Sequence, residues 1–426
     1  MWQVYAFCFS LIFSQTLCFS LKTRWKPPNL EDHIRQHGYP VETHNIITDD
    51  GYILTYHRIP HGKQQPYNNT NGKPVLLQHG LVQSGADFVL EPFSLGYLLA
   101  DNGFDVWLAN SRGNTFSRKH VRLDPDLDKK FWDFSFHDMG YYDLPAAIDY
   151  ILQTTDRDKL LFTGFSMGTT LFFVLGASRP EYMSKVEAAA LVAPVAHPWN
   201  IPSLIVNLVK NISTWLAPVF FPDMTREFLP LSKVSVWAQK TFCDFWPVKK
   251  LQICEEFMKL IVGFHRKDID RVPISHIRKF YPAGTSFKTF EHFRQIIEKD
   301  FAQYDYGDEG NLGTYGQKSP PTYNLSRVTA PIYMHTSVND WLAVPKDVQF
   351  TVKLMPNVKS VRQITDHRFN HMDFCYSSLA KDLVYNNIIK TFKSFPTSTN
   401  GDTHSYANFE SESEEIMEIL GSIDKK

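Results

Sequence analysis

The sequence has almost no net charge and lacks the usual metal and nucleotide motifs. Lys and Arg number 44 and Asp and Glu 45, so the formal net charge of −1 gives no electrostatic footprint for nucleic acid or an anionic membrane surface. There is no H-E-x-x-H, no paired C-x-x-C, no Walker-type glycine loop and no internal repeat. We therefore expect no metal, no cofactor and no nucleic-acid partner; the sequence does not indicate an oligomeric state.

The first twenty residues lack charged side chains, and the first charge is Lys22. This apolar stretch ends in small residues, with Cys18 and Ser20 at positions −3 and −1 if cleavage follows Ser20, which is typical of a secretory signal peptide. The alternative is an uncleaved membrane anchor, because the run nearly reaches the roughly 20 residues that span a bilayer. We predict a signal peptide over residues 1–20 and no membrane span after its removal.

Cysteine is scarce, with five in 426 residues. Removal of the signal leaves Cys243, Cys254 and Cys375, and Cys243 and Cys254 are close enough in sequence to form a disulfide in an oxidising compartment. The alternative is three reduced, buried thiols. Secretion also agrees with three N-glycosylation sequons, at Asn68, Asn211 and Asn324.

Short apolar runs alternate with helix-period segments, which indicates an α/β fold with a mostly parallel sheet and helices on both faces. The expected strands include 74–78, a run ending at Asn110, 160–165 and 187–196, and an antiparallel hairpin surrounds Asp49-Asp50-Gly51. From Trp199 to about Tyr323 no convincing strand is found, and aromatic amphipathic stretches predict a helical cap over 199–324. The core then comprises 21–198 and 325–395, and the acidic segment 396–426 is predicted to be disordered.

Gly164-Phe165-Ser166-Met167-Gly168 fits the G-x-S-x-G pattern. An apolar strand leads into it and a helix with small residues follows, which is the setting that a nucleophile elbow requires. Serine needs a base to remove its proton, and the base needs an orienting carboxylate. The alternative is an ordinary Gly-Ser-Gly turn.

The acid and the base should follow the serine in the chain, in loops just after strands. Asp340 follows the strand-like run 332–335, and His371 follows the last expected strand, 358–364. Asp366 is the rival acid, but it is too close in sequence to the candidate histidines to hold one of them from a separate loop. The rival bases are His367 and His335. His367 fits a solvated loop residue and His335 fits a strand interior.

An oxyanion hole needs two backbone N–H donors, one after the nucleophile and one after an early strand. These positions correspond to Met167 and to Leu81 in Gln78-His79-Gly80-Leu81. His79 precedes the serine and ends a strand, so we expect it to support the oxyanion loop rather than to act as the base.

The motifs LQHGL, NSRGNTFSRKH, FWDFSFHDMGYYDLPAAIDYI, GFSMGTT, NDWLAVPKDV and NHMDF resemble the acid lipase family of α/β-hydrolases, over about Asn29 to Phe395. The resemblance implies a Ser166–Asp340–His371 triad, an oxyanion hole from the Leu81 and Met167 amides, and a helical cap. It also implies hydrolysis of triacylglycerols or cholesteryl esters at a lipid–water interface by a secreted or lysosomal protein. The family usually has G-H-S-Q-G, whereas this chain has Phe165 and Met167.

Two other functions fit the same fold. One is a non-catalytic lipid-binding or interaction protein that retains the hydrolase architecture. The other is a peptidase or an esterase for small, water-soluble esters. We predict a serine lipase that forms an acyl-enzyme.

Overall fold

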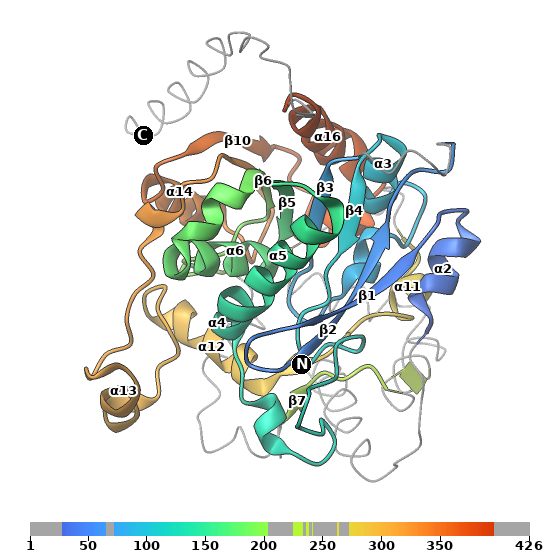
Figure 1. The fold of residues 1–426 in the computed structure, drawn as a ribbon. Coiled ribbons are helices and arrows are strands. Elements are labelled where there is room, and N and C mark those ends of the chain that lie inside the picture. Colours follow the sequence, from blue (N-terminus) through green and yellow to red (C-terminus); the bar gives the residue numbers. More distant parts are fainter. Residues whose placement is uncertain are drawn as a thin grey trace, which may run out of the picture.

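The computed structural model describes residues 28–64, 72–202, 225–232, 236–237, 241, 262–263 and 272–395. Its centre is an eight-stranded sheet with the order β1-β2-β4-β3-β5-β6-β9-β10 (Figure 1). All neighbouring strands from β4 to β10 are parallel, and β2 is antiparallel to both β1 and β4. The strand bounds are β1 Glu42–Ile47, β2 Ile53–Ile59, β3 Pro74–Gln78, β4 Asp105–Leu108, β5 Leu160–Phe165, β6 Val186–Val192, β9 Ile332–Ser337 and β10 Val358–Ile364. The predicted α/β class and the amino-terminal hairpin are confirmed.

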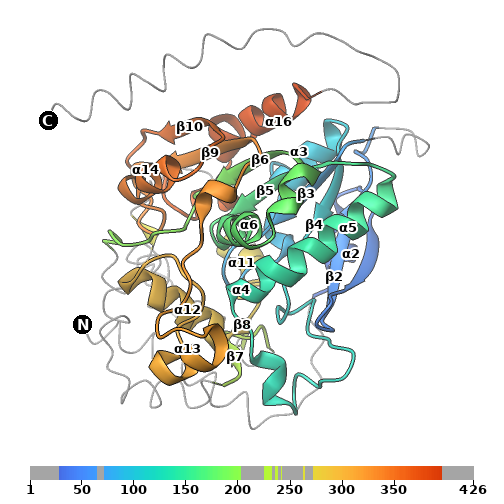
Figure 2. The same ribbon diagram turned by 60° about the vertical axis from the view of Figure 1, so that its left-hand side comes forward.

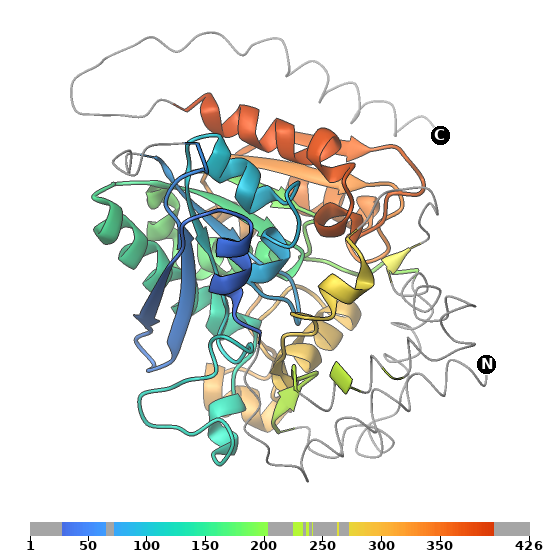
Figure 3. The ribbon, with the colours of Figure 1, turned by 90° about the vertical axis from the view of Figure 1, so that its right-hand side faces the viewer.

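Helices cover both faces of this sheet. On one face lie α4 (Phe136–Asp138), α5 (Leu144–Thr155), α6 (Met167–Ser178) and α14 (Pro345–Lys353), as Figures 1 and 2 show. On the other face, which Figure 3 presents to the viewer, lie α2 (Leu30–Gln36), α3 (Leu95–Asp101), and α16 (Asn386–Lys393). The helices and the sheet therefore enclose two separate buried clusters of apolar side chains, one on each face of the sheet.

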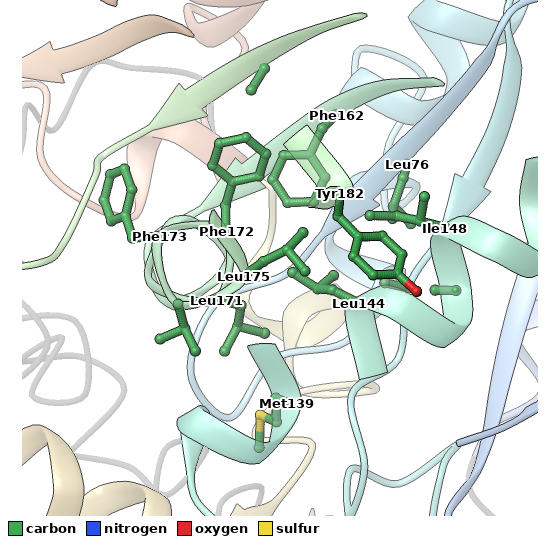
Figure 4. Packing of buried hydrophobic residues seen from close by; sticks show 14 of the residues in the cluster. Leu76, Met139, Leu144, Ile148, Phe162, Leu171, Phe172, Phe173, Leu175 and Tyr182 are labelled. Carbon is green, nitrogen blue, oxygen red and sulfur yellow. The ribbon is translucent and has the colours of Figure 1, made fainter. Parts of the chain in front are cut away.

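The strand that carries the candidate serine is buried on both faces. Every residue of β5 is buried, and its Phe162 ring stacks on Phe172 of α6 with centroids 4.8 Å apart (Figure 4). Helix α6 is itself buried throughout, from Met167 to Ala177. A central parallel strand packed between two helical layers needs an unbroken apolar run, which is why 160–165 shows no alternation.

The carboxyl-terminal helix is not continuous. The sequence after His371 predicts one continuous helix from about Met372, whereas α15 (Asp373–Tyr376) stops before Ser377, whose backbone is extended at φ −103° and ψ 137°. A π-helical turn, Lys381–Tyr385, then leads into α16. The break lets α15 stay near the histidine loop while α16 packs on the sheet.

The prediction that residues 199–323 lack strands is wrong. Two short strands, β7 (Glu227–Phe228) and β8 (Thr285–Ser286), form an antiparallel pair. They accompany the helices α11 (Ile274–Ile277), α12 (Phe287–Glu298) and α13 (Gly307–Tyr315). A two-residue strand is too short to show a period-two pattern in sequence. The partly buried carboxylate of Glu227 is 2.9 Å from the Arg118 guanidinium and so links β7 to the core.

Several predictions fall on residues that the structure does not describe. These are the signal peptide 1–20, the tail 396–426, Asn68, Asn211, and the Cys243–Cys254 disulfide. Asn324 is described; it is exposed and begins a 3-10 turn (Leu325–Arg327), so its placement is compatible with a glycan. Among the helices that the structure describes, none is long and apolar enough to cross a bilayer.

Candidate active site

Ser166 lies on a sharp turn between β5 and α6. Its backbone has φ 52° and ψ −115°, a strained conformation for a residue with a Cβ. The Ser166 N–H donates to the Val192 carbonyl at 3.0 Å, which fixes the turn to the end of β6. A strained serine between a buried strand and a buried helix is the geometry of a nucleophile elbow.

Neither glycine position of the elbow has room for a side chain. A Cβ on Gly164 would lie 2.8 Å from backbone atoms of Gly168, and a Cβ on Gly168 would lie 2.3 Å from the Gln78 carbonyl oxygen. The contacts are with backbone, which cannot move aside as a flexible side chain can. Strand β3, the elbow and α6 therefore approach one another as closely as glycine allows.

We predict that Gly168→Ala destabilises the protein by about 1–3 kcal/mol, because the added methyl group overpacks β3 against α6. Urea unfolding followed by circular dichroism measures the effect. Gly313→Ala is the matched control, since its Cβ would meet nothing within 4 Å in α13. If Gly168→Ala unfolds at the wild-type urea concentration, the close approach inferred at the elbow is wrong.

Ser166, His371 and Asp340 form one hydrogen-bonded series. The His371 Nε2 atom is 2.9 Å from the Ser166 Oγ, and His371 Nδ1 is 2.8 Å from Asp340 Oδ2 and 3.0 Å from Oδ1. His371 and Asp340 are both buried. Because a carboxylate only accepts, Nδ1 carries the proton, and Nε2 is left to accept the serine hydroxyl proton.

Loops at the carboxyl ends of the strands hold these side chains. Asp340 follows β9, and its Oδ1 accepts the N–H groups of Leu342 and Ala343 at 2.9 and 2.8 Å. His371 precedes α15, and its own N–H donates to the Val262 carbonyl at 3.5 Å. The carboxylate is thus oriented by its own turn before it meets the imidazole.

The rival residues lie elsewhere. Asp366 forms an ion pair with Arg368 at 3.0 Å, and His367 is exposed to solvent. His335 is buried in β9, and burial lowers its pKa to about 3, so it stays neutral. Within the described ranges, none of the three forms a hydrogen bond with Ser166 or His371.

The loop after β3 lies directly against the serine. A Cβ on Gly80 would come within 3.3 Å of the Ser166 Cβ. The N–H groups of Leu81 and Met167 donate no hydrogen bond to any described residue. Two unpaired backbone donors beside a serine hydroxyl fit a site for a developing oxyanion.

His79 supports this loop from beneath. Its Nε2 accepts the Ser111 N–H at 3.1 Å, so Nδ1 carries the proton and donates to the Gly80 carbonyl at 2.8 Å. Burial lowers the pKa of His79 to about 4, which keeps the ring in this neutral form over most of the acidic range. In the described part of the chain His79 forms no hydrogen bond with Ser166, as expected for a supporting residue.

The elbow's two unusual residues have different surroundings. Phe165 is buried, and its ring lies 5.0 Å from the His371 ring at 37°, so it packs against the candidate base. Met167 is buried in the cluster beneath α6. Phe165 therefore gives the imidazole an apolar neighbour that cannot titrate.

Sequence reasoning missed three buried polar residues next to the site, namely Gln83, Asp87 and Tyr376. Their contacts join positions almost three hundred residues apart, and no local pattern predicts such pairs. The one sequence signal for these residues is that two polar side chains, Gln83 and Asp87, follow shortly after the apolar strand β3. No group of three His, Cys, Asp or Glu side chains in the described part of the chain is arranged to hold a metal.

Comparison with known proteins shows to which family the chain belongs. Residues 30–92 match the model of a partial α/β-hydrolase lipase region, and residues 73–220 match that of the α/β-hydrolase fold. The chain is 37% identical to Lipase 1 of Drosophila melanogaster over 85% of its length and 79% of that protein's. It is 36% identical to gastric triacylglycerol lipase of Bos taurus, over 91% of this chain and 98% of that one.

The chain belongs to the acid lipase family of α/β-hydrolases. A further relative is the lysosomal acid lipase/cholesteryl ester hydrolase of Macaca fascicularis, with 34% identity over 86% of this chain and 91% of the relative. The family resemblance inferred from the motifs is confirmed. As a member of the acid lipase family, the chain is a carboxylic ester hydrolase.

Proposed function

We propose that this acid lipase family member hydrolyses lipid esters through an acyl-enzyme on Ser166. His371 Nε2 removes the serine hydroxyl proton as Oγ attacks the ester carbonyl, and the protonated ring then delivers the proton to the departing alkoxide. Asp340 holds the imidazole in the required tautomer and stabilises its positive charge. A water molecule, activated by the same histidine, then attacks the acyl-enzyme and releases the fatty acid.

The 2.9 Å contact between Ser166 Oγ and His371 Nε2 is the observation that carries this proposal. We propose in addition that the amides of Leu81 and Met167 bind the carbonyl oxygen when it becomes an oxyanion. Donors fixed in advance stabilise that charge without reorganising during the reaction. In this proposal, the strained elbow presents the Ser166 hydroxyl to the same side as these two amides.

We propose that residues 199–324 form a cap that supplies the acyl-binding surface and covers the site. Three described contacts support this placement. The Ala283 N–H donates to the Val82 carbonyl at 2.6 Å, beside the oxyanion loop. The Asn370 Nδ2 donates to the Gly263 carbonyl at 2.9 Å, and the His371 N–H to the Val262 carbonyl at 3.5 Å, beside the histidine loop. The boundaries at 199 and 324 belong to the proposal.

The substrates that we propose are triacylglycerols or cholesteryl esters, by analogy with the named relatives. The amino-terminal signal-like segment and the sequons support entry into the secretory pathway. We therefore propose that the protein is secreted or lysosomal.

A comparison of substrates tests the lipid assignment. We expect faster turnover per active site on an emulsified long-chain triacylglycerol or cholesteryl ester than on a short, water-soluble ester, because the cap provides an apolar acyl site. Ser166→Ala, assayed alongside, controls for contaminating esterases. Equal or higher turnover on the soluble ester, with no gain from an emulsion, would instead indicate a small-ester hydrolase.

A further inference from the structure

Three buried side chains form a continuous hydrogen-bonded series beside the proposed oxyanion hole. The Gln83 Oε1 accepts the Gly80 N–H at 2.9 Å, and the Gln83 Nε2 donates to the Tyr376 hydroxyl at 3.1 Å. The Tyr376 hydroxyl in turn donates to the carboxylate of Asp87. All three residues are at least 97% buried, so water does not share these contacts.

The series joins two segments that must keep a fixed separation during catalysis. Gln83 and Asp87 belong to the loop and 3-10 turn (Gly85–Phe88) that follow Leu81. Tyr376 is the last residue of α15, which begins two residues after His371. The second carboxylate oxygen of Asp87 accepts the Ser84 N–H at 3.0 Å, which anchors the far end. The oxyanion loop is therefore tied to the helix of the proposed base.

Contacts on both sides of Gly80 fix the direction of the Leu81 N–H, and the Gln83 side chain makes one of them. Gln83 holds the N–H of Gly80, and His79 holds its carbonyl at 2.8 Å. A peptide unit is planar and trans, so a fixed Gly80 carbonyl fixes the Leu81 N–H on the opposite side. Glycine at position 80 is free to rotate unless both of its polar groups are held, and here both are.

Stability alone does not explain this arrangement. Asp87 has hydrogen bonds but no ion-pair partner among the described residues, and burial raises its pKa to about 6. Every member of this buried series is hydrogen-bonded, and a fully satisfied polar series holds the segments that it joins in one arrangement. Apolar side chains of similar size would fill the same space without fixing the direction of any N–H group. A geometric requirement at the adjoining site accounts for it better.

We infer that Gln83 and Tyr376 are positioning residues that hold the Leu81 N–H in register with His371, with Asp87 as the anchor. This inference rests on the proposed function, in which Ser166 attacks an ester and Leu81 binds the oxyanion. Neither residue is assigned a contact with the substrate. Their loss should weaken binding of the transition state and leave binding of the ester unchanged.

The test begins with Gln83→Leu, which keeps the side-chain size and removes both hydrogen bonds. We expect kcat per active serine to fall by about 10- to 100-fold, somewhat less than loss of a whole oxyanion donor, with KM within about two-fold of wild type. The inhibition constant of an alkyl boronic acid, which forms a tetrahedral adduct on the serine, should rise by the same factor as kcat falls. Active serines are counted by fluorophosphonate titration.

Tyr376→Phe removes a single oxygen and keeps the experiment decisive if Gln83→Leu does not fold. We expect its kcat to fall several-fold, and the double variant to be no slower than Gln83→Leu, because both act through one series. Tyr97→Phe is the matched control. The Tyr97 hydroxyl is also buried but has no hydrogen-bond partner in the described structure, so its removal should leave kcat unchanged.

The outcomes separate this inference from the proposed function. Wild-type kcat per titrated serine in both Gln83→Leu and Tyr376→Phe would overturn the inference and leave the triad intact. Losses that appear in KM, with an unchanged boronic acid constant, would also overturn it. If the wild-type protein itself has no serine that fluorophosphonate titrates, the proposed function fails first.

Discussion

Replacing Ser166 with alanine should lower kcat on a lipid ester by about 10⁶-fold, the loss typical of a missing serine nucleophile. Oγ is the only atom that the substitution removes, and it is the atom 2.9 Å from His371 Nε2. The Cβ remains in the strained turn, so no new clash arises. Turnover on an emulsified triacylglycerol measures the loss, and the thermal midpoint of unfolding verifies that the fold is intact.

Ser135→Ala is a suitable control for that experiment. Ser135 is buried, and it caps α4 by accepting the His137 N–H at 3.2 Å, far in sequence from the site. Its loss should cost about 1 kcal/mol of stability with no change in kcat. If Ser166→Ala retained more than a few per cent of wild-type turnover, the acyl-enzyme mechanism would be incorrect.

Asp340→Asn should lower kcat by about 10⁴-fold with little change in KM, because the amide can no longer enforce the tautomer of His371. In the wild-type site, Asp340 Oδ1 accepts two backbone N–H groups, and Oδ2 accepts the Nδ1 proton at 2.8 Å. An amide NH₂ placed next to Nδ1 would favour a proton on Nε2. The imidazole would then be unable to accept the proton of Ser166.

Asp366→Asn is the control that distinguishes the two candidate acids. Asp366 pairs with Arg368 in an exposed loop, so its substitution should leave kcat within about two-fold of wild type. Steady-state kinetics of both variants on one ester suffice. A large loss in Asp366→Asn together with an active Asp340→Asn would reassign the acid.

The parts of the fold that could be predicted from sequence are those with a local cause. The elbow was recognisable because Gly164 and Gly168 are required within the same five residues, by contacts as close as 2.3 Å. Strand β5 was recognisable because burial on both faces demands an unbroken apolar run.

The missed features have non-local or very short causes. Strands β7 and β8 have two residues each, and the break at Ser377 comes from an extended backbone rather than from proline or glycine. The series Gln83–Tyr376–Asp87 depends on contacts between distant segments that only the folded chain brings together. The catalytic assignment of Ser166, Asp340 and His371 stays a proposal until it is tested chemically.

The most direct test is to locate the serine that reacts with a fluorophosphonate probe, by mass spectrometry of the digested protein. We predict a single stoichiometric adduct on Ser166, absent in Ser166→Ala and formed far more slowly in Asp340→Asn. An adduct on a different serine, or lipid hydrolysis by a protein that the probe does not label, would contradict it.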